Sequence, residues 1–214
     1  MILKELERVL TAFTAGLLLI TVSELGDKTF FIAVILSMKH SRRLVFAGAI
    51  AALAAMTVLS VVVGQAVSLL PKSFIHHAEI ALFFGFGVKL LYDGYRMQAS
   101  TCSTEVVEEA KAAVEVADRQ SMKKNNYLGV ILQTFVLTFM AEWGDRTQIA
   151  TIALAAGNNP IGVTTGAILG HAICAAIAVI GGRMIAGRIS ERTVTLVGGF
   201  LFLLFGVLAA IQGS

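Results

Sequence analysis

Glu24-Leu25-Gly26-Asp27-Lys28-Thr29 is a polar stretch between two apolar runs, and it returns 118 positions later as Glu142-Trp143-Gly144-Asp145-Arg146-Thr147. The first copy lies between Val9–Val22 and Phe30–Met38, two runs without a charge. Neither run alone has the roughly 20 residues that a helix needs to cross a bilayer, whereas the two joined through the motif do. We therefore expect the acids near the middle of a membrane, on an interrupted or strained helix, where ionisable groups are costly and usually functional.

The composition supports a membrane protein. Of 214 residues, 57% are hydrophobic and 14% are charged, whereas soluble domains have about 25% charged residues. The lipid bilayer is thus an expected partner. The net charge of +3 is small and no basic patch is interleaved with aromatic residues, so nucleic acid is not expected. A disulfide between Cys102 and Cys174 is not expected either, because one falls in a predicted loop and the other in a predicted membrane helix.

The apolar runs predict six membrane spans and an all-α fold. The spans are Val9–Met38, Leu44–Leu70, Ile80–Met97, Leu128–Ala156, Ile161–Gly182 and Thr193–Gln212. Between the third and fourth spans the composition becomes charged, so residues 98–126 are expected to be mainly a linker that can hold a short surface helix.

The two halves of the chain repeat beyond the motif. The shift of 118 positions carries Gly48 onto Gly166 and Gly64 onto Gly182, and after one inserted residue Phe86-Gly87-Val88 falls on Phe205-Gly206-Val207. This predicts a first three-helix repeat over residues 1–97 and a second over 127–214. Because each repeat has an odd number of spans, the halves should have inverted topology, with a site between them near the midplane.

Basic residues predict the orientation, since cytoplasmic loops are rich in Lys and Arg. The side that carries the linker also holds Lys39, Arg42, Arg43, Arg183, Arg188 and Arg192, against Lys4, Arg8 and Lys72 on the other side. The linker is therefore expected in the cytoplasm and both termini outside it.

The motif offers oxygen ligands at close spacing. On an unbroken helix Glu24 and Asp27 would share a face, with Lys28 nearby and the Ser23 and Thr29 hydroxyls beside them. Gly26 would let an ion or a helix approach the backbone. The second copy has the same pattern in Glu142, Asp145, Arg146 and Thr147, and Gln148 adds an amide oxygen.

If the two copies of the motif come together, their summed charge indicates which ions the site would bind. Four carboxylates with Lys28 and Arg146 beside them leave −2, which one divalent cation or two protons neutralise. Oxygen-rich sites suit hard cations such as Ca²⁺, Mg²⁺ and Mn²⁺. Crowded carboxylates resist full ionisation at low dielectric, so metal and protons should compete for the same oxygens.

At these residues the chain resembles the GDT family of Ca²⁺/Mn²⁺:H⁺ antiporters, in the lysine-exporter superfamily. The resemblance rests on two E-x-G-D-[KR]-[TS] motifs, the three-plus-three repeat and the acidic linker, and it covers nearly the whole chain. It implies that Glu24, Asp27, Glu142 and Asp145 bind metal and protons. It also implies a bacterial inner membrane or a thylakoid-type membrane, with Mn²⁺ or Ca²⁺ as transported ion and no cofactor.

The favoured interpretation is thus a proton-coupled exporter of Mn²⁺ or Ca²⁺, not an enzyme. Two alternatives stay open. The resemblance to the superfamily suggests an exporter of an amino acid or other small organic solute, and the Gly-Asp pairs suggest an intramembrane aspartyl protease, which the duplicated motif disfavours. The sequence also leaves a homo-oligomer open. His171 is expected to contact a neighbouring helix, and Gln65 and Gln133 to hydrogen-bond between helices.

Overall fold

The structure, a computed structural model, describes residues 2–97, 104–120, 126–185 and 190–212, and every regular element in those ranges is a helix. The helices are α1 (Ile2–Glu24), α2 (Lys28–Lys39), α3 (Arg42–Val67), α4 (Lys72–Arg96), α5 (Thr104–Gln120), α6 (Tyr127–Glu142), α7 (Arg146–Gly157), α8 (Pro160–Ile185) and α9 (Glu191–Gln212). Cys102 and Arg188 lie outside the described residues.

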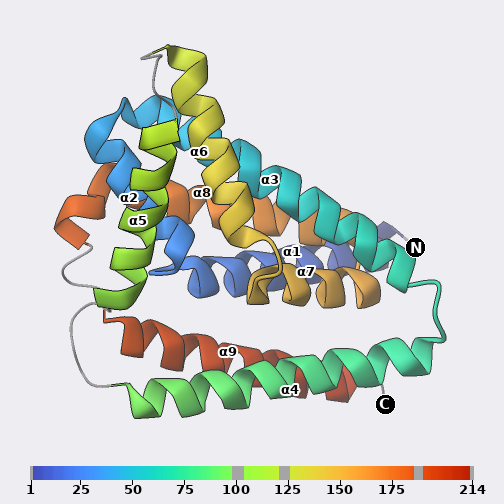
Figure 1. Ribbon diagram of the computed structural model, residues 1–214. Helices are drawn as coiled ribbons and strands as arrows, with labels where there is room; N and C mark the ends of the chain where they lie inside the picture. Colours follow the sequence, from blue (N-terminus) through green and yellow to red (C-terminus); the bar gives the residue numbers. More distant parts are fainter. Residues whose placement is uncertain (1, 98–103, 121–125, 186–189, 213–214) are drawn as a thin grey trace.

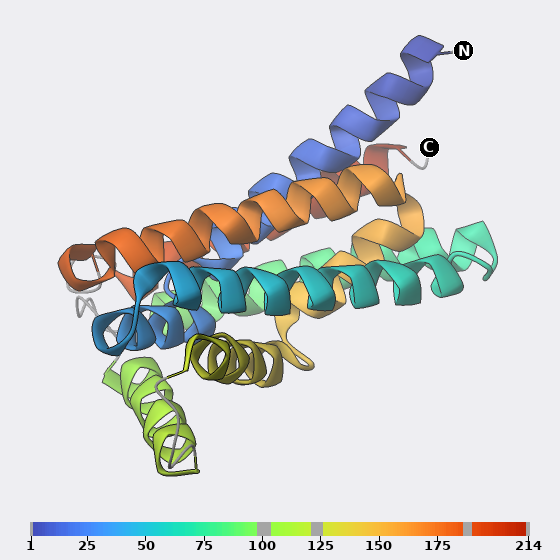
Figure 2. The ribbon, with the colours of Figure 1, turned by 90° about the horizontal axis from the view of Figure 1, so that it is seen from above.

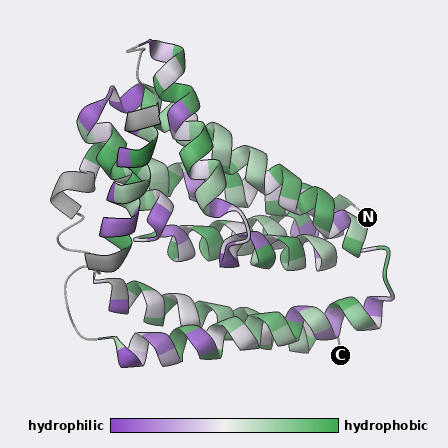
Figure 3. Ribbon diagram, in the orientation of Figure 1, coloured by the Kyte–Doolittle hydropathy of each residue, from purple (hydrophilic) through white to green (hydrophobic). Residues whose placement is uncertain are grey.

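Five of these helices, α1, α3, α4, α8 and α9, are each long and apolar enough to cross a membrane. The pair α6 and α7 adds a sixth span if it is counted as one broken span, bent by 73°. Figure 3 shows hydrophobic residues along α3 and α9, with hydrophilic residues on α5 and around the bend between α6 and α7. The prediction of an all-α, multi-pass membrane protein is confirmed.

Two predicted boundaries were wrong. Helix α1 begins at Ile2 and α4 at Lys72, and not at Val9 and Ile80, because backbone hydrogen bonds continue a helix through polar residues that hydropathy excludes. With 23 residues, α1 is long enough to span by itself. Only the second motif joins two short helices, of 16 and 12 residues.

The long helices run roughly alongside one another, and both termini lie at the same end of the bundle (Figures 1 and 2). Helix α5 lies at the opposite end, beside α2 (Figure 1). Helices α4 and α9 pack together along one side, whereas α6 runs across the long axis and is seen almost end-on in Figure 2. The motif breaks lie inside this arrangement.

Helix packing repeats with the shift seen in the sequence. A Cβ atom added at Gly48 would lie 2.6 Å from the Ile131 carbonyl oxygen, and one at Gly166 would clash with the Phe13 carbonyl oxygen. Gly48 corresponds to Gly166, and Ile131 corresponds to Phe13, under the same shift of 118 positions. In each contact the glycine and its partner lie in opposite halves of the chain. A pseudo-two-fold relation between inverted repeats produces such paired contacts. The repeat boundaries, 1–97 and 127–214, stay a prediction.

The described part of the linker forms a helix that packs against the bundle. Helix α5 has 17 residues, and its Ala110 and Val114 side chains are fully buried in a cluster with residues of α2 and α6. Asp118 accepts hydrogen bonds from Lys39 Nζ and Gln133 Nε2, both at 2.7 Å. Gln65 Nε2 donates to the Ala155 carbonyl oxygen at 2.7 Å, so both glutamines hydrogen-bond between helices, as predicted.

Candidate functional site

Both motifs break a helix at the same place. Helices α1 and α6 end at Glu24 and Glu142, and α2 and α7 begin after Asp27 and Asp145, their N-cap residues. The glycine between each pair has a positive φ, 83° at Gly26 and 81° at Gly144, which a residue with a Cβ atom adopts only at a cost. The predicted interruption is confirmed, but Glu24 and Asp27 do not share one helical face.

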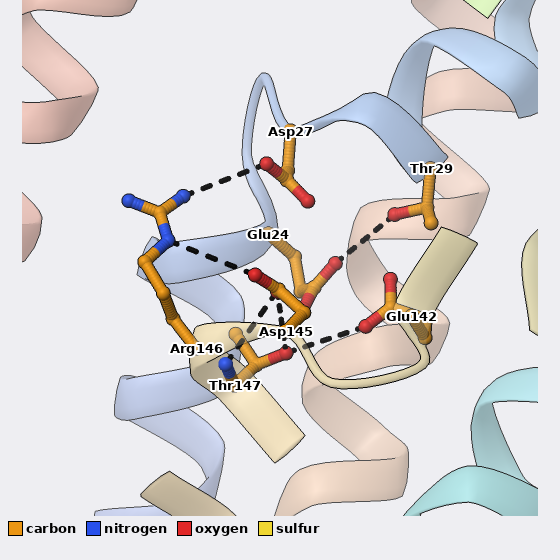
Figure 4. Close-up of polar contacts among 7 residues, drawn as sticks. All are labelled: Glu24, Asp27, Thr29, Glu142, Asp145, Arg146 and Thr147. Atoms are coloured by element: carbon orange, nitrogen blue, oxygen red, sulfur yellow. Dashed lines mark hydrogen bonds and ion pairs between the residues drawn. The ribbon is translucent and has the colours of Figure 1, made fainter. Parts of the chain in front are cut away.

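The two breaks bring acids from both halves together (Figure 4). Glu24, Glu142 and Asp145 each present a carboxylate oxygen, and these three atoms lie within 4.8 Å of one another. Both glutamates are almost completely buried, with 2% and 1% of their surface exposed. Among the described residues this trio is the only group of three or more His, Cys, Asp and Glu side chains close enough to hold one metal ion together.

The threonine of each motif hydrogen-bonds the glutamate of the same motif. Thr29 Oγ1 lies 3.2 Å from Glu24 Oε2, and Thr147 Oγ1 lies 3.3 Å from Glu142 Oε2 and 3.1 Å from Asp145 Oδ2. The other oxygen, Oε1, of each glutamate is buried without a hydrogen-bond partner, as is Ser23 Oγ. Buried polar atoms are rarely left unpaired, so these atoms are free to bind a cation.

Asp27 stands outside the trio and is linked to it by Arg146. The Arg146 guanidinium contacts Asp27 Oδ1 through Nη2 at 3.5 Å and Asp145 Oδ1 through Nε at 3.8 Å (Figure 4). The Arg146 side chain therefore bridges the equivalent aspartates of the two motifs. This contact fixes the breaks relative to each other.

Lys28, the counterpart of Arg146, does not join the site. Its ammonium lies 2.9 Å from Glu109 Oε2 on α5, in a partly exposed pair that contributes little stability. The charge balance counted from the sequence included Lys28, whereas in this structure Arg146 is the one of these two cations that forms an ion pair with the acids. Four carboxylates with Arg146 alone carry −3 when all are ionised, which a divalent cation and one proton together balance.

Gln148 supports the turn and is not placed among the acids. Its Oε1 accepts a hydrogen bond from the Gly144 backbone N–H at 2.7 Å, and its Nε2 lies 3.0 Å from Met56 Sδ on α3. The amide oxygen predicted as a ligand is therefore used to hold the α6–α7 break. Trp143 is 61% exposed, and its ring centroid lies 5.7 Å from that of Phe139 with the ring planes tilted by 47°.

The structure adds two residues to the site's surroundings. Thr138 and His171 line a small cavity of about 10 Å³ with Glu24, and Thr138 Oγ1 and His171 Nδ1 are buried without partners. Thr138 precedes Glu142 by one helical turn, a spacing that could have identified it. His171 comes from α8, so only packing places it beside α1. Its neighbour Cys174 donates to the Thr21 carbonyl oxygen at 3.3 Å.

A cavity of about 100 Å³ reaches the site from the α5 end of the bundle. Asp27 and Arg146 line it together with Asp93 and Met97 near the end of α4, and Val106 of α5. Toward the termini the space is filled by an apolar cluster that includes Phe83, Leu154 and Phe202. In the described part of the chain, the cavity that adjoins Asp27 and Arg146 therefore lies on the α5 side of the carboxylates.

Comparison with known proteins identifies relatives over most of this chain. The family described as "Divalent cation/proton antiporter GDT1" matches residues 12–98 and 130–214, which include both motifs. A GDT1-like protein of Synechocystis is 59% identical over 94% of this chain and 97% of its own length. GDT1-like protein 5 of Arabidopsis thaliana is 40% identical over 92% of this chain and 94% of its own.

GDT1-like protein 4 of Oryza sativa is 43% identical over 92% of this chain and 72% of its own length. No solved structure matches the chain. The family's activity is transport, which favours cation exchange over the protease and the organic-solute exporter. With the family match over most of the chain and a relative at 59% identity, this multi-pass membrane protein belongs to the GDT1 family of divalent cation/proton antiporters.

Proposed function

We propose that the protein exports Mn²⁺ or Ca²⁺ from the cytoplasm in exchange for protons, and that Glu24, Asp27, Glu142 and Asp145 bind both. The carrying observation is the trio of carboxylate oxygens within 4.8 Å, contributed by both halves. Carboxylate and hydroxyl oxygens are the ligands that hard divalent cations prefer. No resident cofactor is needed, because the metal is the cargo.

Proton coupling follows from the charges. With all four acids ionised and Arg146 as the one cation among the described residues that forms an ion pair with them, the site carries −3. A metal-bound site is balanced by one divalent cation and one proton, and an empty site by three protons. Each cycle then exchanges two protons for one metal ion, and apparent metal affinity falls about a hundredfold per unit decrease in pH while both protons are displaced.

The two ends of the bundle supply the alternating access. The cavity at the α5 end adjoins Asp27 and Arg146, while an apolar cluster separates the carboxylates from the end that holds the termini. Rocking of inverted halves about a fixed midplane site opens each side in turn. The Lys and Arg distribution supports a cytoplasmic α5, and with that orientation the open cavity faces the cytoplasm.

The testing experiment reconstitutes the full chain in liposomes and records Mn²⁺ and Ca²⁺ flux with an internal pH indicator. A proton gradient should drive metal uphill in the wild type. Glu24→Gln and Glu142→Gln should abolish exchange, whereas Glu7→Gln, at an exposed position on α1, should not. Proton-independent metal flux in the wild type, or normal exchange in Glu24→Gln, would contradict the proposal.

Orientation and membrane have a separate test. In a background without Cys102 and Cys174, Glu115→Cys on the exposed face of α5 should be protected from impermeant thiol reagents in intact bacterial cells, and labelled after the inner membrane is permeabilised. Labelling in intact cells would place α5 outside the cytoplasm and reverse the direction of transport.

A further inference from the structure

A second polar cavity lies at the end of the bundle that holds the termini. Its volume is about 660 Å³, and the first two turns of α4 and the end of α7 line it. Lys72, His76 and Glu79 fall on one face of α4, at i, i+4 and i+7, and Gly157 and Asn158 face them from the end of α7. None of the motif residues reaches this cavity.

The repeat relates the two cavities. The shift of 119 positions carries Ile75, His76 and Glu79 onto Val194, Thr195 and Gly198. The first three line the cavity at the termini, and their counterparts line the cavity that adjoins Asp27. The two cavities are therefore equivalent openings at opposite ends, and only the opening at the termini has a carboxylate at this position.

Glu79 is a buried carboxylate for which the described residues supply no ion-pair partner. It is 8% exposed, and its hydrogen bond from Asn158 Nδ2 to Oε1 is long, at 3.5 Å. In the described part of the chain no Lys, Arg or His nitrogen forms an ion pair with it. An ionised carboxylate in such a place needs a counter-ion.

The surroundings of Glu79 favour a cation. A Cβ atom added at Gly157 would lie 2.6 Å from Glu79 Oε2, so the carboxylate lies against the C-terminal end of α7. The C-terminal end of a helix carries partial negative charge and attracts cations. His76, three residues before Glu79 on the same helix, adds an imidazole on the same side. The buried acid and the helix end favour a cation here, and the His76 imidazole lines the same cavity.

We propose that Glu79 and His76 form a second, weaker binding site for the transported divalent cation, on its path from the central carboxylates to the side of the termini. This role rests on the proposed function. A single carboxylate beside Lys72, in a wide cavity, binds less tightly than the three clustered acids, since divalent-cation affinity rises with ligand charge. Weak binding at the exit favours release over return.

The test counts Mn²⁺ sites by electron paramagnetic resonance on the purified full chain. The wild type should show a tight class and a weak class. Glu79→Gln should lower the affinity of the weak class about tenfold or more through loss of its one anionic ligand and leave the tight class. Glu24→Gln should remove the tight class alone, and Glu7→Gln should keep both.

Two further variants guard against misfolding of Glu79→Gln. His76→Asn removes the imidazole, and Gly157→Ala displaces the Glu79 carboxylate through the added methyl group; both should weaken only the weak class. An unchanged weak class in Glu79→Gln overturns the Glu79 site. If the Glu79→Gln protein cannot be purified, an unchanged weak class in both His76→Asn and Gly157→Ala overturns it. Absence of the tight class in the wild type would instead contradict the proposed function.

Discussion

Phe83 and Phe202 lie with their ring centroids 6.0 Å apart and their ring planes at 61°, and they are 119 positions apart, at equivalent places in α4 and α9. Two flanking ring contacts are equivalent under the same shift. The Phe86 and Phe202 centroids are 5.7 Å apart, and the Phe83 and Phe205 centroids are 6.0 Å apart. Both helices therefore meet through equivalent residues. Phe202 lines the cavity beside Asp27, and neither phenylalanine lines the cavity at the termini, so the aromatic contact borders the first cavity.

Truncation of Phe202 in this aromatic cluster should let protons leak through the protein. We expect Phe202→Ala to allow proton flux without metal, because water can enter the space that the ring fills beside the first cavity. Phe200→Ala, at a 65% exposed position on the same helix, is the matched control and should stay tight. Acidification of liposomes without metal measures the leak; a Phe202→Ala protein as tight as the wild type would exclude a barrier role.

The charge and the length of the Arg146 side chain should both affect exchange activity. Arg146→Lys keeps the charge and should retain part of the exchange activity, while Arg146→Gln should lose most of it, because Asp27 and Asp145 then face each other without the shared cation. Both are compared in the same metal flux assay. Equal activities of the two variants would mean that the charge of Arg146 has no part in balancing the site.

Gly144 should tolerate no side chain for a conformational reason. A Cβ atom at Gly144 would meet nothing within 4 Å, but φ is +81°. Gly144→Ala should therefore destabilise the protein by about 1–2 kcal/mol, the cost of a left-handed residue, without a packing defect. Thermal unfolding in detergent measures it, and Gly144→Asn, which tolerates this conformation better, should lose less. A larger loss for Asn than for Ala would point to sterics instead.

Gly166 should be intolerant for the opposite reason, close packing. An added methyl group collides with the α1 backbone at Phe13, and overpacking costs about 1–3 kcal/mol. Gly85 is also helical but has open space around it, so Gly85→Ala should be neutral or stabilising by up to about 1 kcal/mol. Unfolding temperatures in detergent separate the two, and similar values would remove the argument for a tight α1–α8 contact.

Docking of α5 should depend on pH through Asp118. Partial burial alone raises the pKa of Asp118, but hydrogen bonds from Lys39 and Gln133 and the nearby Lys39 charge outweigh it and lower the pKa from its usual 3.8. A lowered pKa stabilises the docked state at pH values above the unfolded pKa, and this stabilisation is lost as pH falls through the folded pKa.

Amide hydrogen exchange of α5, corrected for intrinsic rates, should thus be constant between about pH 5 and 8 and rise only in stronger acid. Asp118→Asn should raise exchange at neutral pH and remove the acid dependence. Glu109→Gln, which breaks the Lys28 contact, should change exchange less, because that pair is more exposed. Exchange that increases near neutral pH in the wild type would assign the docking to another group.

The sequence alone determined the all-helical membrane fold, the helix interruptions and which acidic residues come together at them. These are local properties: apolar runs of fixed length form membrane helices because the bilayer leaves no other way to satisfy the backbone, and Gly26 and Gly144 permit a conformation that other residues avoid. The paired motif also predicted which side chains meet, because equivalent positions of two repeats share one site.

Tertiary structure decided how those side chains share the site. Lys28 pairs with Glu109, 81 positions away, while its counterpart Arg146 reaches Asp27 across the repeat. Gln148 binds its own turn, and His171 arrives from α8. Long side chains reach several partners within one rotamer change, so the packing of α5, α8 and the two breaks selects the partner and sets the charge that a cation must balance.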